Sequence, residues 1–353
     1  MSLARIARAL GISVTTVSRA LAGYDDVAPA TRALVIAEAD RIAYRPNEAA
    51  RRLRRGRAEA IGVVLPSGPG QFDDPFFLRM LSAIGPALEA EKLDLLVTTA
   101  RPGADALRAY RHLVENRKVD GIILARTRRQ DERISYLLDR DFPFVAHGRS
   151  LESRPFAYVD IDGEAACRAA TERLLSFGHT RIALINALPL YMFAHHRKAG
   201  WLAALGTPGP LREVEPTEEN GFRAMQDLLA TEHPHERPTA VLCATDRIAV
   251  GAMHALAHAG LRAGRDVALI GYDDLPLATY TDPPLTTIAQ PIERAARRMV
   301  EMLLARIGGA PAEGMQEIWP ARLIARQSDG PPAGNHTPRN RQGDSRHEPT
   351  LHP

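Results

Sequence analysis

From residue 61 onward, short runs of β-branched and aliphatic residues alternate with longer stretches of helical periodicity. The first part of this region contains the runs AIGVVL, LDLLVTT, VDGIILA and PFVAHG, and the second contains YVDIDGE, RIALIN, AVLCAT and VALIGY. Strands that alternate with helices along a chain form a parallel sheet with helices on both faces. Because the alternation restarts after YVDIDGE, we expect two similar α/β lobes.

Polar side chains stand where several of these strands end. Ligands of such lobes bind beyond the carboxyl ends of the strands, in a cleft that both lobes share. Asp273 and Asp274 directly follow ALIGY, where a carboxylate can accept hydroxyl hydrogen bonds from a polyol or sugar, although the pair could also simply cap a turn. His147 and Arg149 close the fourth strand of the first lobe. Phe76 could stack on an apolar ring face or belong to the core.

Two short helical patterns separated by a glycine occupy the first 23 residues. Ser2 can cap the first pattern, whose apolar residues recur at helical spacing over residues 3–10, and Gly11 ends it. Ser13 can cap the second pattern, which Gly23 ends. Two short helices joined by a tight glycine turn are typical of a helix-turn-helix, whose second helix enters the major groove of DNA.

The second helix would turn Val17 and Leu21 toward a core. Its outward residues would be Val14, Thr15, Ser18 and Arg19. Hydroxyl groups and an arginine can donate hydrogen bonds to phosphates and base edges, so this surface suits DNA.

A third helix is expected to complete the small N-terminal core. Pro29 suits its first turn, and the helix would continue to about Ile42. We expect Leu34, Val35 and Ile42 to close the core.

The next segment, YRPNEAARRLRRGR over residues 44–57, is rich in arginine. Asn47 can cap a short helix in which Ala50 and Leu53 belong to a narrow apolar edge. Such a helix is marginal alone, so we expect it to fold on DNA, where paired copies could wedge Leu53 into a minor groove. A solvated linker is the alternative.

Charge is distributed unevenly along the chain. Residues 1–58 contain eleven arginines and five acidic residues, which gives a formal charge of +6, whereas the whole chain carries +3 and the remainder therefore −3. A basic head on a mildly acidic body is expected when one end binds a polyanion. A merely solvated basic face is the alternative.

The order and spacing of several motifs resemble those of the lactose-repressor (LacI) family of bacterial transcription regulators. In the head and first strand, the motifs are LARIARALGISVTTVSRALAG, VAPATRALV, YRPNEAARRL and AIGVVLP. Further motifs up to about residue 327 are VDGIIL, YVDIDG, FGHTRIALI, RKAGW, ATDRIAVGAM, VALIGYDDLPLA and PPLTTIAQP. The resemblance implies an all-α helix-turn-helix head and a hinge helix, joined to a two-lobed α/β effector domain of the periplasmic-binding-protein type.

The resemblance also implies a domain organisation in which the chain crosses three times between the lobes. The expected parts are a DNA-binding domain (1–46), a hinge helix or linker (47–58), a ligand-binding and dimerisation domain (59–327) and a disordered tail (328–353). Within the ligand-binding domain, lobe 1 would comprise residues 59–159 and 290–317, and lobe 2 residues 160–289 and 318–327. The tail lacks the leucine heptad through which some relatives form tetramers, so we expect a homodimer.

Specific roles follow from the same resemblance. In the head, Val14 and Thr15 would read bases, Ser13, Thr16, Ser18 and Arg19 would support them, and Ala50 and Leu53 would be the minor-groove residues of the hinge. In the cleft, Asp273 matches the ligand-binding aspartate, Arg197 matches an arginine that faces the cleft, and Thr245 stands where relatives often carry a polar pocket residue. Relatives commonly have an aromatic residue before the helix that here begins near Gly221, where this chain has EPTEEN. This departure leaves open both the stacking wall and the identity of the effector.

Several classes of protein are disfavoured. His195, His196 and Arg197 have no carboxylate or cysteine at metal-ligand spacing, and no glycine-rich phosphate loop follows a strand, so we expect neither a metal nor another cofactor. Cys167 and Cys243 suggest no disulfide framework. No apolar run of about 18 residues and no signal peptide is evident, so we expect a cytoplasmic, nucleoid-associated protein without membrane partners.

The pattern therefore predicts a dimeric repressor that binds operator DNA and responds to a small ligand, for which we expect a carbohydrate inducer such as an α-glucoside. A nucleobase co-repressor is the alternative effector. A plain sugar-binding protein would have no use for the basic head, and an enzyme would need an acid–base pair that the adjacent Asp273 and Asp274 do not supply.

Overall fold

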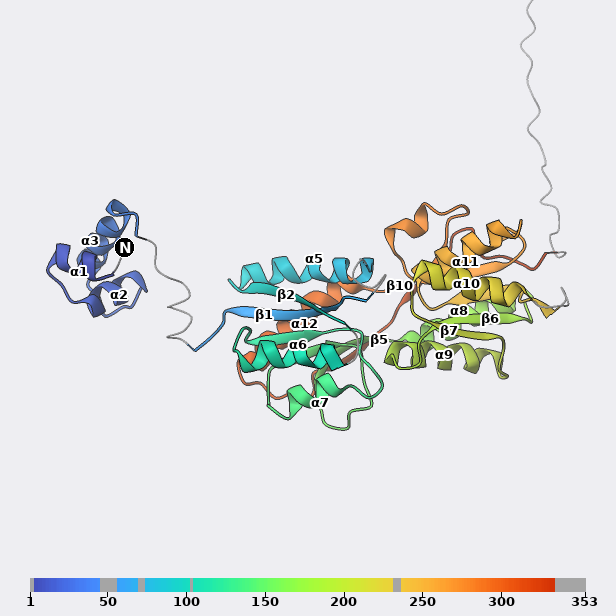
Figure 1. The fold of residues 1–353 in the computed structure, drawn as a ribbon, viewed down its shortest axis with the longest axis horizontal. Helices are drawn as coiled ribbons and strands as arrows, with labels where there is room; N and C mark the ends of the chain where they lie inside the picture. Colours follow the sequence, from blue (N-terminus) through green and yellow to red (C-terminus); the bar gives the residue numbers. More distant parts are fainter. Residues whose placement is uncertain (1–2, 45–55, 69–73, 102–103, 231–235, 334–353) are drawn as a thin grey trace, which may run out of the picture. The chain divides into compact units, whose positions relative to one another are not determined.

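The computed structural model describes residues 3–44, 56–68, 74–101, 104–230 and 236–333 (Figure 1). The chain divides after Glu59 into two compact units, which are described separately. Within the described ranges, no helix is both long and apolar enough to cross a membrane.

The N-terminal unit is the expected helix-turn-helix with a third helix. Its elements are α1 (Leu3–Leu10), α2 (Val14–Leu21) and α3 (Pro29–Arg41). Gly11 and Gly23 follow α1 and α2 with φ angles of +65° and +77°, which a residue with a Cβ adopts only at a cost. Ile6, Val17 and Val35 are fully buried at the centre of this small core.

The predicted core position of Leu34 is wrong. Leu34 is 60% exposed, whereas Val35 and Ile42 are buried as expected. Val35, Ala39 and Ile42 recur at helical spacing and share one face of α3. The neighbouring residue 34 is rotated by about 100° around the helix axis and therefore points away from the core.

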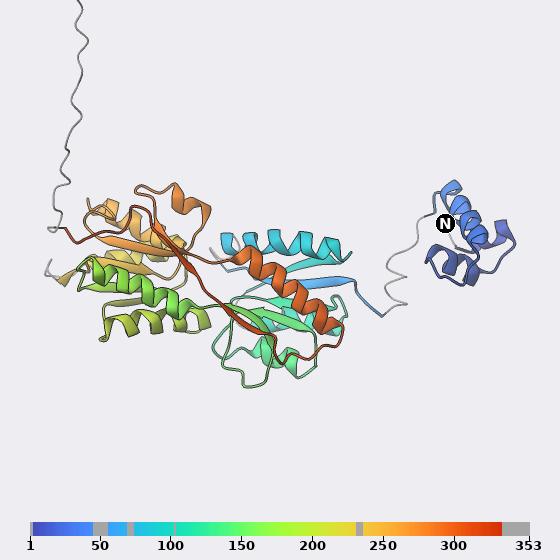
Figure 2. The same ribbon diagram turned by 180° about the vertical axis from the view of Figure 1, so that it is seen from behind.

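The larger unit contains two α/β lobes, as predicted. In lobe 1, the parallel sheet has the order β11-β5-β4-β3-β1-β2, formed by β1 (Ala60–Pro66), β2 (Asp94–Ala100), β3 (Gly121–Leu124), β4 (Phe144–His147), β5 (Ala157–Ile161) and β11 (Gln316–Trp319). Its helices are α5 (Pro75–Ala90), α6 (Ala104–Glu115), α7 (Glu132–Leu138) and α12 (Ile292–Ile307). Helices α5 and α12 lie side by side over one face of the sheet (Figure 2), while α6 packs against β1 and β2 and contacts α7.

Lobe 2 has a similar sheet with the order β12-β10-β9-β8-β6-β7. Its strands are β6 (Ile182–Ala187), β7 (Leu211–Val214), β8 (Ala240–Cys243), β9 (Ala268–Asp273), β10 (Thr286–Ala289) and the antiparallel β12 (Arg322–Ile324). Its helices are α8 (Gly163–Ser176), α9 (Met192–Leu205), α10 (Glu218–Leu229) and α11 (Asp246–His258), with a short 3₁₀ helix over Pro276–Thr279. Helix α8 packs with one hydrophobic cluster against the sheet and α10 and α11 with another, while α9 contributes Trp201 to the first and Ala194 to the second.

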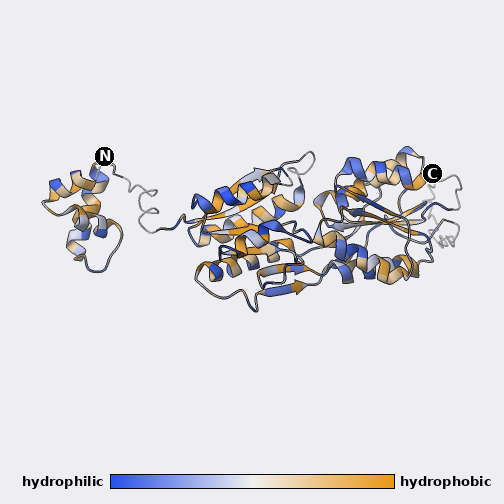
Figure 3. Ribbon diagram, turned by 60° about the horizontal axis from the view of Figure 1, so that its bottom comes forward, coloured by the Kyte–Doolittle hydropathy of each residue, from blue (hydrophilic) through white to orange (hydrophobic). Residues whose placement is uncertain are grey.

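Burial explains the hydrophobic runs of the sequence. Strands β3, β4, β6 and β8 are buried along their whole length, so they lack the polar alternation of a strand with one wet face. Figure 3 shows that the helices carry both hydrophobic and hydrophilic residues, as expected for helices that cover a sheet with one face.

The chain passes between the lobes three times. It leaves lobe 1 after β5, returns from β10 to α12, and crosses again between β11 and β12. Ile161 and Trp319 still pair with each other in lobe 1, so the first and third crossings follow these residues. Three strand connections on one side leave the carboxyl ends of both sheets facing a common cleft.

The predicted disorder of the tail is wrong for residues 328–333. Ser328 is fully buried, and its Oγ donates to the Leu269 carbonyl oxygen (2.7 Å) and accepts from the Thr286 amide (2.8 Å). Hydrogen bonds to strand backbone, rather than apolar contacts, therefore hold this segment on lobe 2, and its polar composition did not reveal them. Residues 334–353 lie outside the described residues.

Helices α10 and α11 approach each other where both carry a glycine. A Cβ on Gly251 would overlap the carbonyl oxygen of Glu218, and one on Gly221 would overlap that of Ile248. In contrast, a Cβ on Gly85 in α5 would meet no atom of another described element within 4 Å, although Pro86 follows it in the helix.

We therefore expect Gly251→Ala to lower the free energy of unfolding by about 1–3 kcal/mol, because the added methyl group must push the helices apart. Gly85→Ala is the matched control and should change the free energy of unfolding by less than about 1 kcal/mol, because the helix propensity of alanine is opposed by the contact of its Cβ with the ring of Pro86. Urea denaturation measures both effects. Equal midpoints for the two variants would contradict the close contact of α10 with α11.

Candidate functional site

The outer face of α2 presents the predicted DNA-reading residues. Val14 is 45% exposed, and Thr15 and Arg19 are also exposed, while Thr16 and Ser18 are half-buried. Val14 and Thr15 thus offer a methyl-rich and a hydroxyl surface at the first turn of α2, the end of a recognition helix that contacts base edges.

Other predicted residues of the head are engaged within the unit. Ser13 caps α2: its Oγ accepts from the Thr16 amide (3.0 Å) and lies 2.8 Å from Thr16 Oγ1. Arg19 Nε donates to Asp26 Oδ1 (3.2 Å), and the guanidinium lies 4.9 Å from the centre of the Tyr24 ring. Both partners of the Arg19–Asp26 pair are exposed, so the pair contributes little stability and a phosphate can replace the carboxylate.

The hinge residues that the sequence predicts, Asn47, Ala50 and Leu53, lie outside the described residues.

A cavity opens between the two lobes at the carboxyl ends of their strands. It contains about 670 Å³ of empty space, counting its opening to solvent. All six residues predicted to bind ligand line it: Phe76, His147, Arg149, Arg197, Thr245 and Asp273. The structure therefore brings together, from both lobes, side chains that lie up to 197 residues apart in the sequence.

Arg197 is fixed at the centre of this cavity. Its Nη1 donates to the Ala244 carbonyl oxygen, and its Nη2 lies 3.9 Å from Asp273 Oδ1. The guanidinium carbon lies 3.5 Å from the centre of the Tyr272 ring and 4.6 Å from that of Phe193, so the group is held between two aromatic rings. Nε of Arg197 is buried and has no hydrogen-bond partner in the described part of the chain, so it can donate to a ligand.

Asp273 is almost entirely buried beside Arg197. Its Oδ1 accepts from Gln290 Nε2 (2.6 Å). Burial raises the pKa of Asp273 to about 8; Arg197 opposes this shift, and the carboxylates of Asp246 and Asp74 add to it. The group is therefore largely protonated at neutral pH and can both donate and accept a hydrogen bond.

The turn that carries Asp273 is itself held by a buried carboxylate. Asp273 and Asp274 have φ angles of +117° and +50°, and only Asp273 lines the cavity. Asp246 Oδ2 accepts from the Leu275 amide (2.7 Å), and its Oδ1 accepts from Thr287 Oγ1 (2.5 Å). Asp246 thus fixes this unfavourable backbone conformation.

Asp274 points elsewhere, because Arg326 Nη2 donates to its Oδ1 at 2.6 Å. The two adjacent acids therefore have different roles, and the turn-capping alternative does not describe Asp273.

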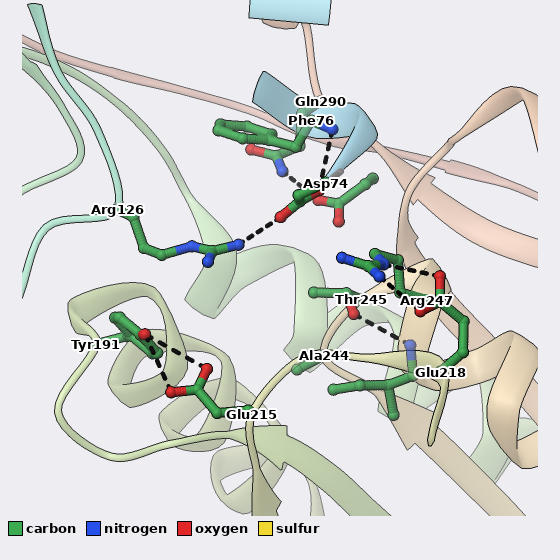
Figure 4. A network of polar contacts seen from close by, with 12 residues as sticks. Asp74, Phe76, Arg126, Tyr191, Glu215, Glu218, Ala244, Thr245, Arg247 and Gln290 are labelled. Atoms are coloured by element: carbon green, nitrogen blue, oxygen red, sulfur yellow. Dashed lines mark hydrogen bonds and ion pairs between the residues drawn. The ribbon is translucent and has the colours of Figure 1, made fainter. Parts of the chain in front are cut away.

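Three arginine–aspartate pairs face the cavity (Figure 4 shows part of this network). They are Arg126–Asp74, Arg149–Asp160 (Nε to Oδ2, 2.6 Å) and Arg197–Asp273. Each pair places a donor beside an acceptor, which matches neighbouring hydroxyl groups on a polyol.

Sequence reasoning missed Asp74, Arg126, Asp160 and Gln290. Arg126 follows the strand run GIILA and Asp160 lies within YVDIDG, so the strand-end rule could have found both.

His147 and Phe76 form an aromatic wall of the cavity. Their ring centres lie 5.3 Å apart in an edge-on arrangement, and Phe76 also packs edge-on against Phe77 at 5.4 Å. Phe76 therefore belongs both to the cavity wall and to the edge of the core. Burial lowers the pKa of His147, which keeps the imidazole neutral, and its Nε2 has no hydrogen-bond partner among the described residues.

Thr245 combines a structural contact with its place in the cavity lining. Its Oγ1 accepts from the Ile248 amide (3.2 Å) and so caps α11. A substitution at Thr245 would therefore disturb the helix end as well as the cavity.

The acidic side chains of the segment EPTEEN make contacts away from the cavity. Its helix α10 begins at Glu218, earlier than the expected start near Gly221. Glu215 accepts from the Tyr191 hydroxyl (3.4 Å), and Glu218 pairs with the buried Arg247 at 2.6 Å (Figure 4). Neither acid lines the cavity, whose aromatic residues come from other elements.

In the part of the chain that the structure describes, no cluster of three or more histidine, cysteine or acidic side chains could hold a metal ion. Cys167 and Cys243 are both buried and free.

The pKa of Asp273 predicts a specific pH dependence of stability. An unfolded chain ionises Asp273 near its ordinary pKa of 3.8, whereas the folded protein does so near 8. Between these values the folded state binds more protons, so this residue makes the fold less stable as the pH rises. Asp273→Asn cannot ionise, and its melting temperature relative to the wild type should rise between about pH 6 and about pH 8.5. A difference that is the same at both pH values would contradict the buried, protonated carboxyl group.

Two family models match the chain. The model for bacterial regulatory proteins of the lacI family matches residues 2–47, and a periplasmic binding protein-like domain matches residues 171–328. The HTH-type transcriptional regulator RafR of Escherichia coli is 39% identical over 325 residues, which cover 90% of this chain and 96% of RafR. AglR of Rhizobium meliloti (strain 1021) is 36% identical over 341 residues, covering 94% and 95% of the two chains.

Solved structures extend the similarity to the whole fold. The lac repressor dimer bound to operator and the anti-inducer ONPF is 27% identical, with a TM-score of 0.82 over 94% of this chain and 99% of the other. The complex of the transcriptional regulator CelR with cellobiose is 30% identical, with a TM-score of 0.71 over 93% and 99%. Members of this family regulate transcription and are not enzymes. Similarity of this extent shows that the chain belongs to the LacI family of bacterial transcriptional regulators, which bind DNA under the control of a small ligand.

Proposed function

We propose that this regulator is a homodimeric repressor whose inducer is a neutral sugar bound in the cavity between the lobes. The observation that carries the proposal is the set of arginine–aspartate pairs that face this cavity. Arg126 and Arg149 are balanced by the carboxylates of Asp74 and Asp160, while Arg197 lies beside the protonated carboxyl group of Asp273. Donors and acceptors therefore alternate along the cavity, which suits a ligand with many hydroxyl groups. In line with this, the solved structure of the relative CelR is a complex with cellobiose.

The aromatic residues of the cavity argue against a nucleobase. A purine binds best between flat faces that it can stack on. Here the faces of Tyr272 and Phe193 are covered by Arg197, and Phe76 meets His147 edge-on. A site for a sugar ring needs only one apolar surface, with hydrogen-bonding groups around it.

The head supports operator binding by two copies of α2. Val14 and Thr15 would discriminate bases, while Ser13, Thr16, Ser18 and Arg19 would contact phosphates and nearby bases. A two-fold symmetric dimer requires a roughly palindromic operator. The arginine-rich hinge, with Asn47 at its start and Ala50 and Leu53 at the minor groove, would add affinity that falls steeply with salt.

Contacts between the lobes supply a means of control. The Met192 amide of lobe 2 donates to the Thr127 carbonyl oxygen of lobe 1 (3.0 Å), and the Arg129 amide donates to that of Leu190 (2.9 Å). A sugar that touches both lobes favours one angle between them and shifts the population toward it. In a dimer, that shift alters the spacing of the two hinge segments and so lowers the affinity for the operator.

The test combines selection of a DNA site in vitro with fluorescence anisotropy in the presence of sugars and purines. We expect a palindromic site whose binding one sugar weakens. Asp273→Ala should reduce the sugar response by at least about tenfold, since a buried hydrogen-bonding group is lost, and leave operator affinity nearly unchanged. Leu53→Ala should weaken operator binding and leave the sugar affinity nearly unchanged.

Equal loss of both functions in either variant would contradict this division of labour. If no sugar weakens DNA binding and a purine strengthens it, the effector is a nucleobase co-repressor.

A further inference from the structure

The turn that follows α2 brings three side chains of the head together. The Tyr24 amide donates to the Arg19 carbonyl oxygen (3.1 Å), and Arg32 of α3 donates from Nη2 to the Tyr24 carbonyl oxygen (2.6 Å). Val27, at the end of the turn, is buried in the core of the head. These contacts anchor the turn to α2 and α3, and the anchored turn places Tyr24 and Asp26 beside Arg19.

The Arg19 guanidinium is held along one edge and over one face. Its Nε donates to Asp26 Oδ1 (3.2 Å), and its Nη2 pairs with Asp26 Oδ2. The guanidinium carbon lies 4.9 Å from the centre of the Tyr24 ring, whose face attracts a cation. The carboxylate thus takes up the side edge of the guanidinium, while the N–H groups at its outer end, on Nη1 and Nη2, point away from the carboxylate.

The charges around Arg19 favour a base over a phosphate. Arg19 and Asp26 together carry no net charge, and the adjacent Asp25 adds another exposed carboxylate. A phosphate would have to approach against these carboxylates or displace Asp26 from the guanidinium. A guanine edge carries no net charge, and its O6 and N7 atoms accept two N–H bonds from one arginine. The free end of the guanidinium therefore matches guanine.

The Arg19–Asp26 pair becomes stronger where water is excluded. In the free protein its side chains are 45% and 54% exposed, and a pair in such a position contributes little to folding. Base pairs in the major groove would cover the same atoms, and a hydrogen bond between charged groups strengthens as the local dielectric constant falls. The carboxylate therefore lowers the general attraction to DNA and at the same time fixes the direction of the guanidinium.

We propose that Asp26 and Tyr24 are positioning residues that orient the outer end of Arg19 toward one guanine in each operator half-site. This inference rests on the proposed binding of the operator by α2, and it names a base that each half-site must contain. Displacement of Asp26 by a phosphate is the alternative. In that case Arg19 would add affinity without discriminating between bases.

The test uses the full-length protein and the palindromic site obtained by selection in vitro. Fluorescence anisotropy measures the affinity for this site, for versions in which one G·C pair of each half-site is replaced by A·T, and for unrelated DNA at several salt concentrations. One of these replacements should lower the affinity of the wild type by at least about fivefold, because a bidentate contact with guanine is lost in each half-site. We call this factor the guanine discrimination.

Asp26→Asn removes the carboxylate that holds the guanidinium. It should lower the guanine discrimination by at least about threefold. It should also raise the affinity for unrelated DNA and make that affinity fall more steeply with salt, because each protomer loses one negative charge. Asp25→Asn is the matched control, since it removes the same charge from the adjacent residue. It should raise the affinity for unrelated DNA in the same way and leave the guanine discrimination unchanged.

Arg19→Lys keeps the positive charge but lacks the planar group that bonds guanine through two N–H groups. It should abolish the guanine discrimination and change the affinity for unrelated DNA by less than about twofold. In this background Asp26→Asn should cause no further loss of discrimination, because the carboxylate acts through the guanidinium. Tyr24→Leu should lower the discrimination of the wild type, whereas Tyr24→Phe keeps the aromatic ring and should not.

Three outcomes would overturn the proposal. If Asp26→Asn and Asp25→Asn change the affinities for all sites in the same proportion, Asp26 acts only through its charge. If Arg19→Lys keeps the discrimination at every G·C pair, Arg19 does not read guanine. In both cases operator binding by α2 stands. If selection recovers no palindromic site, operator binding by α2 fails together with this inference.

Discussion

Burial of the Asp273 carboxyl group beside the Arg197 guanidinium is the interaction on which the rest of the cleft depends. Removing two charges from water costs several kcal/mol per ion unless they are paired and hydrogen-bonded. The protein limits this cost by stacking Arg197 between two rings, by a hydrogen bond from Gln290 to Asp273, and by a pKa that keeps Asp273 largely protonated. A ligand that bonds both groups completes the hydrogen bonds that the protein leaves open.

The same turn connects the ligand-binding chemistry to the other lobe. Arg79, on α5 of lobe 1, donates from Nη1 to the carbonyl oxygens of Asp273 (3.0 Å) and Asp274 (3.2 Å), while its Nε bonds Glu293 at 2.9 Å. Asp246 holds the turn from the opposite side. A displacement of Asp273 is therefore transmitted through Arg79 to α5. The start of this helix places Asp74 and Phe76 in the cavity. Coupling of this kind needs two discrete lobe arrangements that the ligand prefers unequally.

Sequence patterns predicted the parts of the molecule that follow a strong local rule. Two α/β lobes follow from alternating strands and helices, and the strand-end rule led to His147 and Asp273. Arg197 and Thr245 came from the family resemblance, because nothing in their local sequence distinguishes a cavity residue from a buried one. The Arg126–Asp74 pair was not predicted, because the partners lie 52 residues apart and meet only in the folded lobe.

The errors in prediction have equally specific causes. Leu34 lies in ALVIA, where adjacent apolar residues leave the rotation of the helix undecided until Val35, Ala39 and Ile42 fix it. Residues 328–333 are held by hydrogen bonds from Ser328 to strand backbone, which a hydropathy pattern does not register. Both cases depend on contacts between segments that are distant in sequence.

We expect ligand binding in the cleft and operator binding by the head to be thermodynamically linked. The most direct measurement determines operator affinity with and without saturating sugar, and sugar affinity with and without saturating operator. Linkage requires the two ratios to be equal, and we expect sugar to weaken operator binding and operator to weaken sugar binding by the same factor. A sugar that binds the cleft with an affinity unaffected by operator would contradict control of this regulator through that cleft.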